Sequence, residues 1–411
     1  MAYSPRPHRC PQPQPRLGWR SAAVALMALG AIAAPHPAIA SPSEPPPLSR
    51  SIEVDTSDPL YPNLIVDRPL SNQEQRILRE ALTQLQLEGQ RQYDAGNTEA
   101  AFEVWLRELR LRQVLSRREE VDALARVGGV AWEENRTTEV RLIGNRLGEV
   151  EQMIRNRPSP DYGLLLQIAD SYKTLRERER AIAAYTTIIE QANQQGDSAT
   201  EATALAALGE VHLAWFDYAS AQPVYQRLLA VRRAQQDTLG EQQALQKLVI
   251  VYDETAQADD AITARQGLIQ RYRQLNELTE IPPLKLAIAQ RHRQLGQLNA
   301  AVRAYQETVA VGQQVGYVGY VADAYRGLAE LYLEADRPGD ALTAYRFLLD
   351  AERQSYNTYG MMDTFDRIGQ IHRQLGANQQ AIAAFQRGLT LAQQLSYRTD
   401  YFVAQIQSVQ P

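Results

Sequence analysis

The stretch Ala181-Ile182-Ala183-Ala184-Tyr185 decides the fold, because its small residue and the aromatic residue four positions later recur along the chain. Successive alanines of this motif stand 40 residues apart from Ala181 to Ala381. The motif recurs, with its two weaker copies included, at Ala101/Trp105, Val140, Ala221/Tyr225, Ala261/Arg265, Ala301/Tyr305, Ala341/Tyr345 and Ala381/Phe385. A fixed period of this length predicts a stack of structural repeats.

A second small position precedes each of these motifs by about twelve residues. It is occupied by Gly89, Gly128, Ala169, Gly209, Val249, Ala289, Ala329 and Gly369. Two small positions in one period fit two antiparallel helices whose backbones approach closely, with large residues packed around the contact. One such helix pair cannot bury its apolar face alone, so the pairs are expected to stack into a continuous core.

This pattern resembles the tetratricopeptide repeat, in which small and large residues alternate across a helical pair. The period of 40 residues is closer to the longer repeats of kinesin light chains. The resemblance implies an all-α fold: an α-α superhelix (solenoid) of about eight helix pairs with a C-terminal capping helix. Ser198 with Glu201 and Thr238 with Glu241 are expected to be capping boxes of two of these helices.

The chain divides into five predicted segments. Residues 1–40 read as a signal peptide, since a basic stretch and a short apolar run end in Ala38-Ile39-Ala40. An uncleaved anchor is the alternative. Residues 41–70 are rich in Pro and Ser, which predicts a flexible spacer. A capping box of Ser71 and Glu74 then begins the helices. We expect two atypical repeats over 71–157, six regular repeats over 158–397 and a capping helix over 398–411.

The predicted signal peptide implies export by the general secretory route, to a periplasm, a thylakoid lumen or the extracellular space. Cleavage would remove Cys10, the only cysteine, and would leave a chain that does not span a membrane. In these respects the chain resembles exported tetratricopeptide proteins of bacteria, and of cyanobacteria in particular.

The composition and motifs argue against chemistry and against nucleic-acid binding. The chain has 43 basic and 48 acidic residues, well mixed, which is not the basic footprint of a nucleic-acid-binding protein. Glycine-rich phosphate motifs and nucleophile elbows do not occur in the sequence. His212, His292 and His372 alternate with tyrosines at one repeat position, which indicates an interior role for all three. We therefore predict no catalytic residue, no metal site, no cofactor and no enzymatic activity.

The resemblance places the first helix of each pair along a concave groove, and this predicts a protein-binding or peptide-binding face. A solvated wall without a partner is the alternative. The Lys and Asn positions with which co-chaperones of the family hold a C-terminal carboxylate are not matched, which disfavours a reader of chaperone tails. The candidate groove residues are Asp170, Lys173, Glu210, Asp253, Gln290, Arg293, Arg326, Glu330, Gln370 and Arg373.

Tyrosines gather in the last turns between repeats and form a second candidate surface. They are Tyr317, Tyr320, Tyr356, Tyr359, Tyr397 and Tyr401, and stacking of the repeats is expected to place them along one edge. Tyrosine suits recognition because it offers a large contact area with few rotatable bonds. The alternative is that each tyrosine pair fastens one helix pair to the next.

These features favour a non-catalytic scaffold or adaptor that binds a peptide or a helical segment of another protein. By analogy, its role would be the assembly of an envelope or lumenal complex. Two alternatives stay open: a ligand-sensing module that encloses a small molecule within the superhelix, and an architectural protein that self-associates through the tyrosine edge.

Overall fold

The computed structural model describes residues 52–61, 68–157 and 160–409. The chain divides into two units, Met1–Ser49 and Arg50–Pro411, and all described residues belong to the second. The expected signal peptide lies outside the described residues. So do 41–51 and 62–67 of the expected spacer.

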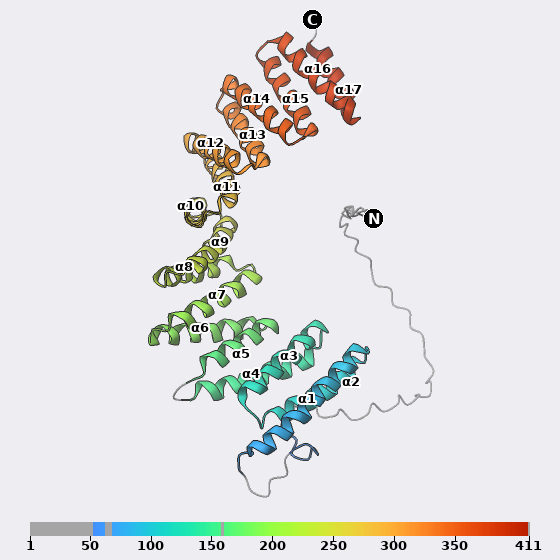
Figure 1. Cartoon of the computed structure of the whole chain (residues 1–411), viewed down its shortest axis with the longest axis vertical. Helices are drawn as coiled ribbons and strands as arrows, with labels where there is room; N and C mark the ends of the chain where they lie inside the picture. The colour runs from blue at the N-terminus through green and yellow to red at the C-terminus, as the bar shows by residue number, and fades with distance from the viewer. Residues whose placement is uncertain (1–51, 62–67, 158–159, 410–411) are drawn as a thin grey trace, which may run out of the picture. The chain divides into compact units, whose positions relative to one another are not determined.

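The described residues form seventeen α-helices and one short 3-10 helix, with no strand among them (Figure 1). The first helices of eight pairs are α1 (Asn72–Asp94), α3 (Arg117–Glu133), α5 (Tyr162–Thr174), α7 (Ser198–Ala214), α9 (Thr238–Glu254), α11 (Ile281–Gln294), α13 (Val318–Glu334) and α15 (Thr358–Gln374). Their partners are α2 (Thr98–Arg112), α4 (Thr137–Arg155), α6 (Arg178–Gln195), α8 (Tyr218–Ala234), α10 (Ala258–Gln274), α12 (Leu298–Val315), α14 (Pro338–Gln354) and α16 (Asn378–Leu395). The helix α17 (Thr399–Val409) packs on α16. Every α-helix contacts its neighbours in the chain, which confirms the predicted α-α solenoid of eight pairs.

The alanine and aromatic positions form the contact between the two helices of a pair. Ala181, Ala221 and the four later alanines of the motif are all 0% exposed. The aromatic ring lies across the small position of the partner helix: a Cβ atom added at Gly209 would come within 2.5 Å of the Tyr225 ring. Gly369 stands in the same relation to Phe385. The small residues that recur every 40 positions therefore lie where the two helices of a pair pack closely.

In the fifth pair an ion pair replaces the aromatic residue between the two helices. Arg265 stands at the aromatic position, is buried, and forms an ion pair with Asp253 on the preceding helix. Arg291 of the next pair reaches the same carboxylate at 2.8 Å. The buried guanidinium is thus neutralised, as a buried charge requires.

The first helix of the sixth pair begins differently from the others. A 3-10 turn, η1 (Leu278–Glu280), precedes α11. Pro282 and Pro283 lie in the first turn of α11. Proline is tolerated there because the first amide groups of a helix have no partner within it.

Two expected capping boxes are wrong. The N-cap residues of α7 and α9 are Asp197 and Asp237, whose side chains accept hydrogen bonds from the amides of Thr200 and Gly240. Glu201 is buried and forms an ion pair with Arg227 on the partner helix. The aspartate one residue earlier competes successfully because its carboxylate carries a charge favourable at the helix N-terminus. The capping box of Ser71 and Glu74 is present as expected.

Part of the expected spacer packs on the helices. Ile52 is 6% exposed, and its carbonyl accepts a hydrogen bond from the Gln113 side chain. The Asp58 carboxylate lies 2.7 Å from Arg107 of α2. Residues 52–61 are therefore docked against the first pair, because the segment contains apolar and acidic side chains that find partners there.

The three histidines differ in their environment, and the interior role expected of all three holds fully for one. His212 is 7% exposed and its Nδ1 lies 3.3 Å from Asp217. Burial lowers the pKa of His212, an effect that Asp217 opposes. His292 and His372 are half-buried, although they occupy the same position in their helices as His212.

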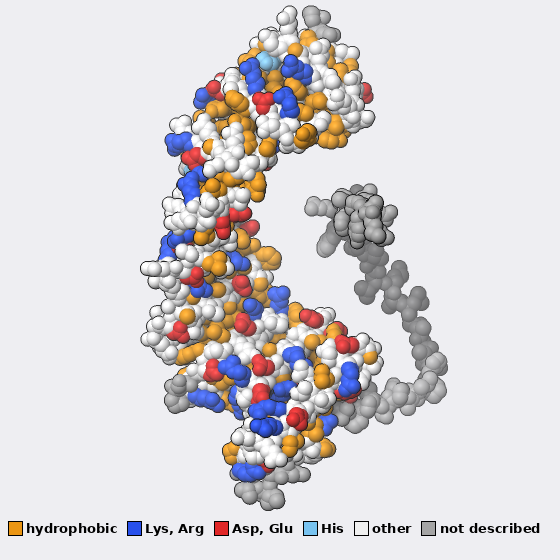
Figure 2. All heavy atoms as spheres, viewed as in Figure 1, with side chains coloured by type: hydrophobic (Ala, Val, Ile, Leu, Met, Phe, Trp, Pro, Cys, Tyr) orange, Lys and Arg blue, Asp and Glu red, His pale blue; other side chains and the backbone are white. Residues whose placement is uncertain are grey.

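Among the described helices, none combines the length and apolar character needed to cross a membrane. Basic and acidic side chains are interspersed on the face seen in Figure 2.

Candidate functional site

The candidate groove residues all lie on first helices of the pairs. Asp170 and Lys173 are on α5, Glu210 on α7, Asp253 on α9, Gln290 and Arg293 on α11, Arg326 and Glu330 on α13, and Gln370 and Arg373 on α15.

Many of these side chains already have partners, and the partners lie on neighbouring pairs. The Lys173 amino group is 3.7 Å from Glu210 on the next first helix. Arg293, at the same repeat position three pairs later, lies 2.7 Å from Glu330 and 2.5 Å from Glu334. These residues therefore link successive first helices, and only part of their charge is available to a partner.

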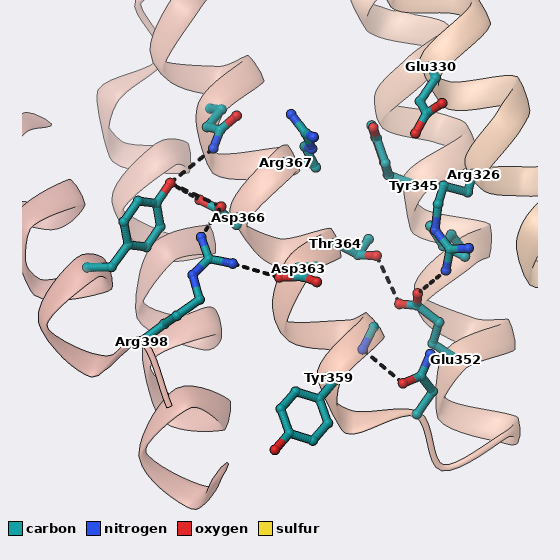
Figure 3. Close-up of a pocket in the computed structure, with 15 residues that line it drawn as sticks. Arg326, Glu330, Tyr345, Glu352, Tyr359, Asp363, Thr364, Asp366, Arg367 and Arg398 are labelled. Atoms are coloured by element: carbon teal, nitrogen blue, oxygen red, sulfur yellow. Dashed lines mark hydrogen bonds and ion pairs between the residues drawn. The ribbon is translucent and has the colours of Figure 1, made fainter. Parts of the chain in front are cut away.

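The C-terminal end of the solenoid contains a cavity of about 660 Å³, here called the terminal pocket (Figure 3). Its residues come from α13, α14, α15 and the start of α17. They are Arg326, Glu330, Tyr345, Leu348, Glu352, Asn357, Tyr359, Gly360, Asp363, Thr364, Asp366, Arg367, Gln370, Arg398 and Tyr401. The pocket thus joins three of the candidate groove residues to two of the candidate tyrosines.

One wall of the terminal pocket is built on Glu352, a residue of α14 with 0% exposure. Its carboxylate accepts hydrogen bonds from Arg326 of α13 at 3.0 Å and from Thr364 of α15 at 2.9 Å. Burial raises the pKa of Glu352, while the bonds from Thr364 and Arg326 act to lower it. This wall holds the last two helix pairs in register.

The opposite wall is built on Arg398, which immediately precedes α17. Its guanidinium lies 2.8 Å from Asp363 and 3.0 Å from Asp366, both on α15. The Tyr401 hydroxyl donates to Asp366 at 3.1 Å, and Gln370 donates to the Tyr401 hydroxyl at 3.2 Å. These polar contacts fix the start of α17 to α15, and within the same segment the Arg398 guanidinium lies 4.3 Å from the centre of the Tyr401 ring.

Arg367 differs from the other two arginines of the terminal pocket. Figure 3 shows it between Asp366 and Tyr345, with no dashed line reaching its guanidinium. Within the part of the chain that the structure describes, Arg367 forms no ion pair and no hydrogen bond through its side chain, whereas Arg326 and Arg398 are each paired with two carboxylates. Its donors are therefore available to an acceptor that enters the pocket.

The candidate tyrosines separate into distinct groups. Tyr317 and Tyr320 have ring centres 6.0 Å apart, and Tyr359 and Tyr397 form a second, edge-on pair at 6.0 Å. Tyr356 is 90% exposed. The Tyr359–Tyr397 contact joins two successive turns, while the Tyr401 hydroxyl turns away to Asp366 in the terminal pocket.

Sequence reasoning missed Glu352, Thr364, Asp366 and Arg398. The repeat position of Glu352 holds Ala192, Arg232, Tyr272, Gly312 and Ala392 in other pairs, so the burial of Glu352 had no clear signal in the sequence. The pairing of Arg398 with α15 had no signal either, because the equivalent positions 40 and 80 residues earlier hold the uncharged Thr358 and Val318.

The described residues contain no cluster of His, Cys, Asp and Glu suited to hold a metal ion. What the terminal pocket offers is a set of charged and aromatic side chains on rigid helices, with one unpaired guanidinium. Such an arrangement can bind a polar chain by hydrogen bonds and by contact with tyrosine rings.

Two family models match parts of the chain. The model described as tetratricopeptide repeat matches residues 363–395, within α15 and α16. It supports the description of the chain as a tetratricopeptide repeat protein. The model described as anaphase-promoting complex subunit 5 matches residues 153–214 and 233–322, which is less than half of the chain.

No curated protein matches the sequence. Several solved structures are similar in fold over part of their length. BtubC from P. vanneervenii is 18% identical with a TM-score of 0.36, over 53% of this chain and 92% of that one. Aspartyl phosphate phosphatase F from Bacillus subtilis is 14% identical with a TM-score of 0.35, over 80% and 85%. The C-terminal part of a TPR repeat-containing protein from Cytophaga hutchinsonii is 13% identical with a TM-score of 0.40, over 65% and 95%.

Proposed function

We propose that this chain is a non-catalytic scaffold that binds an extended peptide or a helical segment of another protein along the first helices of its pairs, with the terminal pocket as the anchoring site. The family match over residues 363–395 includes five residues of this pocket, Asp363, Thr364, Asp366, Arg367 and Gln370, all on α15. Solenoids of this class offer a long surface built from successive helices, which suits elongated partners.

The observation that carries the proposal is the unpaired Arg367 in a pocket whose other charges are neutralised. The Arg326–Glu352 and Arg398–Asp366 contacts hold the walls in place before any partner arrives. A preorganised pocket loses little side-chain entropy on binding, so more of the contact energy appears as affinity.

The chemistry of the pocket indicates the chemistry of the partner. Arg367 would receive a carboxylate, either an Asp or Glu side chain, in a paired geometry that guanidinium favours. Tyr359 is 55% exposed at the rim and would cover an apolar or aromatic side chain next to that carboxylate. The expected partner therefore presents an acidic residue beside an apolar one.

A capture experiment with matched variants tests this proposal. The chain is immobilised, a native extract is passed over it with crosslinker, and the bound proteins are identified by mass spectrometry. Arg367→Glu reverses the charge in the pocket without breaking an ion pair seen in the structure. Arg346→Glu is the control, because Arg346 lies on α14 and is exposed but does not line the pocket.

The proposal expects one protein that the parent chain and Arg346→Glu capture and Arg367→Glu loses. Equal capture by all three chains would place the binding face elsewhere, and no specific capture would count against a scaffold.

We also propose that the chain works after export, in the assembly of an envelope or lumenal complex. The support is the sequence of residues 1–40 alone. The N-terminus of the chain isolated from its native cells tests it: a mature protein that begins at Ser41 is expected, and an intact Met1 would contradict cleavage.

A further inference from the structure

A second cavity, of about 340 Å³, lies between α10 and α12 and has α11 at its base. It shares no residue with the terminal pocket. The residues that line it include Ile269, Arg273, Lys285, Ile288, Arg303 and Glu307.

Lys285 is the most unusual of these residues. It is 7% exposed and stands four positions before the small residue Ala289. The same position in the other seven pairs holds Leu85, Leu124, Leu165, Leu205, Leu245, Tyr325 and Phe365. An amino group at a position that is otherwise apolar costs stability, since lysine is seldom fully buried without a partner. Packing alone does not account for this lysine.

The same repeat position makes packing contacts in other pairs. Each contact joins the first helix to a residue 22 positions later on the second helix. Tyr325 stacks on Phe347 with ring centres 5.4 Å apart, and Arg387 lies 5.8 Å from the centre of the Phe365 ring. In the sixth pair the corresponding residues are Lys285 and Glu307, which form an ion pair. An apolar or ring contact is thus replaced by two charges at the side of an open cavity.

Two further cations of the cavity have no counter-ion. Arg273 and Arg303 both line it, and neither forms an ion pair with another residue of the described part of the chain. The repeat positions equivalent to Arg303 hold Ala183, Pro223, Thr263, Thr343 and Ala383, so this arginine too is particular to the sixth pair. Three cationic groups, Arg273, Lys285 and Arg303, face the single carboxylate of Glu307, which leaves two positive charges.

We propose that this cavity binds the dianionic phosphate group of a small molecule. Two uncompensated positive charges match one dianion, and two guanidinium groups beside an amino group provide the donors that phosphate oxygens accept. Ile269 and Ile288, both buried, give the floor an apolar surface on which the rest of the molecule would lie. His292, whose Nδ1 is 2.5 Å from Gln297, completes the rim.

Binding at this cavity is independent of the scaffold role, because Lys285 and Arg303 lie on helices outside the terminal pocket. The phosphate could belong to a free ion or to an organic ester. The ester has the apolar floor as an additional contact, so glycerol 3-phosphate is expected to bind more tightly than inorganic phosphate.

Isothermal titration calorimetry of the purified chain with these two probes tests the proposal. Lys285→Met gives the cavity an apolar side chain of the kind that the other pairs accept, and Arg303→Gln removes a second charge. Arg353→Gln is the control, because Arg353 occupies the repeat position of Arg273 in another pair and lies outside the cavity. Thermal unfolding of each variant shows that it is folded.

The parent chain is expected to bind glycerol 3-phosphate saturably in the millimolar range or below. Lys285→Met and Arg303→Gln should each weaken binding by about tenfold or more, since each removes a charge-assisted contact. Arg353→Gln should bind as the parent does. The absence of saturable binding to either probe, or equal weakening in Arg353→Gln, would overturn the proposal.

Discussion

The buried carboxylate of Glu352 lies 3.0 Å from the guanidinium of Arg326 and 2.9 Å from the hydroxyl of Thr364. The three residues lie on three helices, α14, α13 and α15, so one carboxylate joins the seventh pair to the eighth. Stability of the last two pairs and the shape of the terminal pocket are therefore expected to depend on the same contact.

Breaking this contact should destabilise the chain. Arg326→Met leaves Glu352 buried without its cation, a change that costs about 3–5 kcal/mol when both partners are buried. We expect the loss in free energy of unfolding to lie at or below the lower end of that range, because the Arg326 side chain is 39% exposed. The double variant Arg326→Met with Glu352→Met should recover most of the loss in urea denaturation. A loss no larger than that of Arg353→Met, which breaks an exposed pair worth about 0–1 kcal/mol, would contradict this role.

Glu352 also predicts a dependence of stability on pH. Burial holds the pKa of Glu352 above its ordinary value of 4.5, so the folded chain binds this proton more tightly than the unfolded chain. The contribution of Glu352 is then most favourable below pH 4.5 and is lost as the pH rises through the folded pKa. Glu352→Gln, which cannot ionise, should gain stability relative to the parent across that window. Urea denaturation between acid and neutral pH measures the difference, and a constant difference would contradict the prediction.

The alanines of the 40-residue motif provide a test of the packing register. Ala221→Leu and Ala301→Leu should each lower the free energy of unfolding by ~1–3 kcal/mol, because both alanines are fully buried between two helices. The exposed Gln194 is the control position, and Gln194→Leu should have little effect. Equal stability of the three variants in thermal unfolding would mean that the assigned register is wrong.

Two exposed aromatic residues occupy left-handed backbone positions. Phe216 has φ 56° and is 77% exposed, and Tyr356 has φ 55° and is 90% exposed. Glycine stands at the same turn positions in other pairs, as at Gly296 and Gly316.

Because a left-handed conformation costs a residue with a side chain about 1 kcal/mol, Phe216→Gly and Tyr356→Gly should each raise stability by up to that amount. Gln235→Gly, at a right-handed position with φ −77°, should lower it by about 0.5–1 kcal/mol. If all three glycine substitutions lower the thermal stability, the rings of Phe216 and Tyr356 make stabilising contacts and the prediction is wrong.

The fold could be predicted from the sequence because its main determinant is periodic. The burial of Ala181, Ala221 and Ala301 and the approach of Tyr225 to Gly209 follow from residue size alone, and each repeats at 40 residues. In such a chain the same sequence pattern marks each helix pair. The capping boxes assigned to Ser198 and Thr238 were less predictable, because an aspartate stood next to each and the better cap depends on local geometry.

The candidate site was predictable only in part. Arg326, Glu330 and Gln370 were found because the resemblance assigns the faces of the first helices, and Tyr359 and Tyr401 because tyrosines cluster there. Contacts between neighbouring helix pairs decide whether a charged side chain on such a face is free to bind a partner. Arg293 is engaged by Glu330 and Glu334, while Arg367 has no such partner. Pairings across 26 to 41 residues follow from the stacking geometry and have no local signal in the sequence.

The most direct test of the scaffold proposal is site-specific photocrosslinking in the native cells. A photoreactive phenylalanine analogue at Tyr359, on the rim of the terminal pocket, should crosslink one defined partner protein, and Arg367→Glu in the same chain should abolish that crosslink. The analogue placed at Arg346, outside the pocket, should not capture that protein. Crosslinking of the same protein from both positions, or of no protein from Tyr359, would contradict the terminal pocket as the anchoring site.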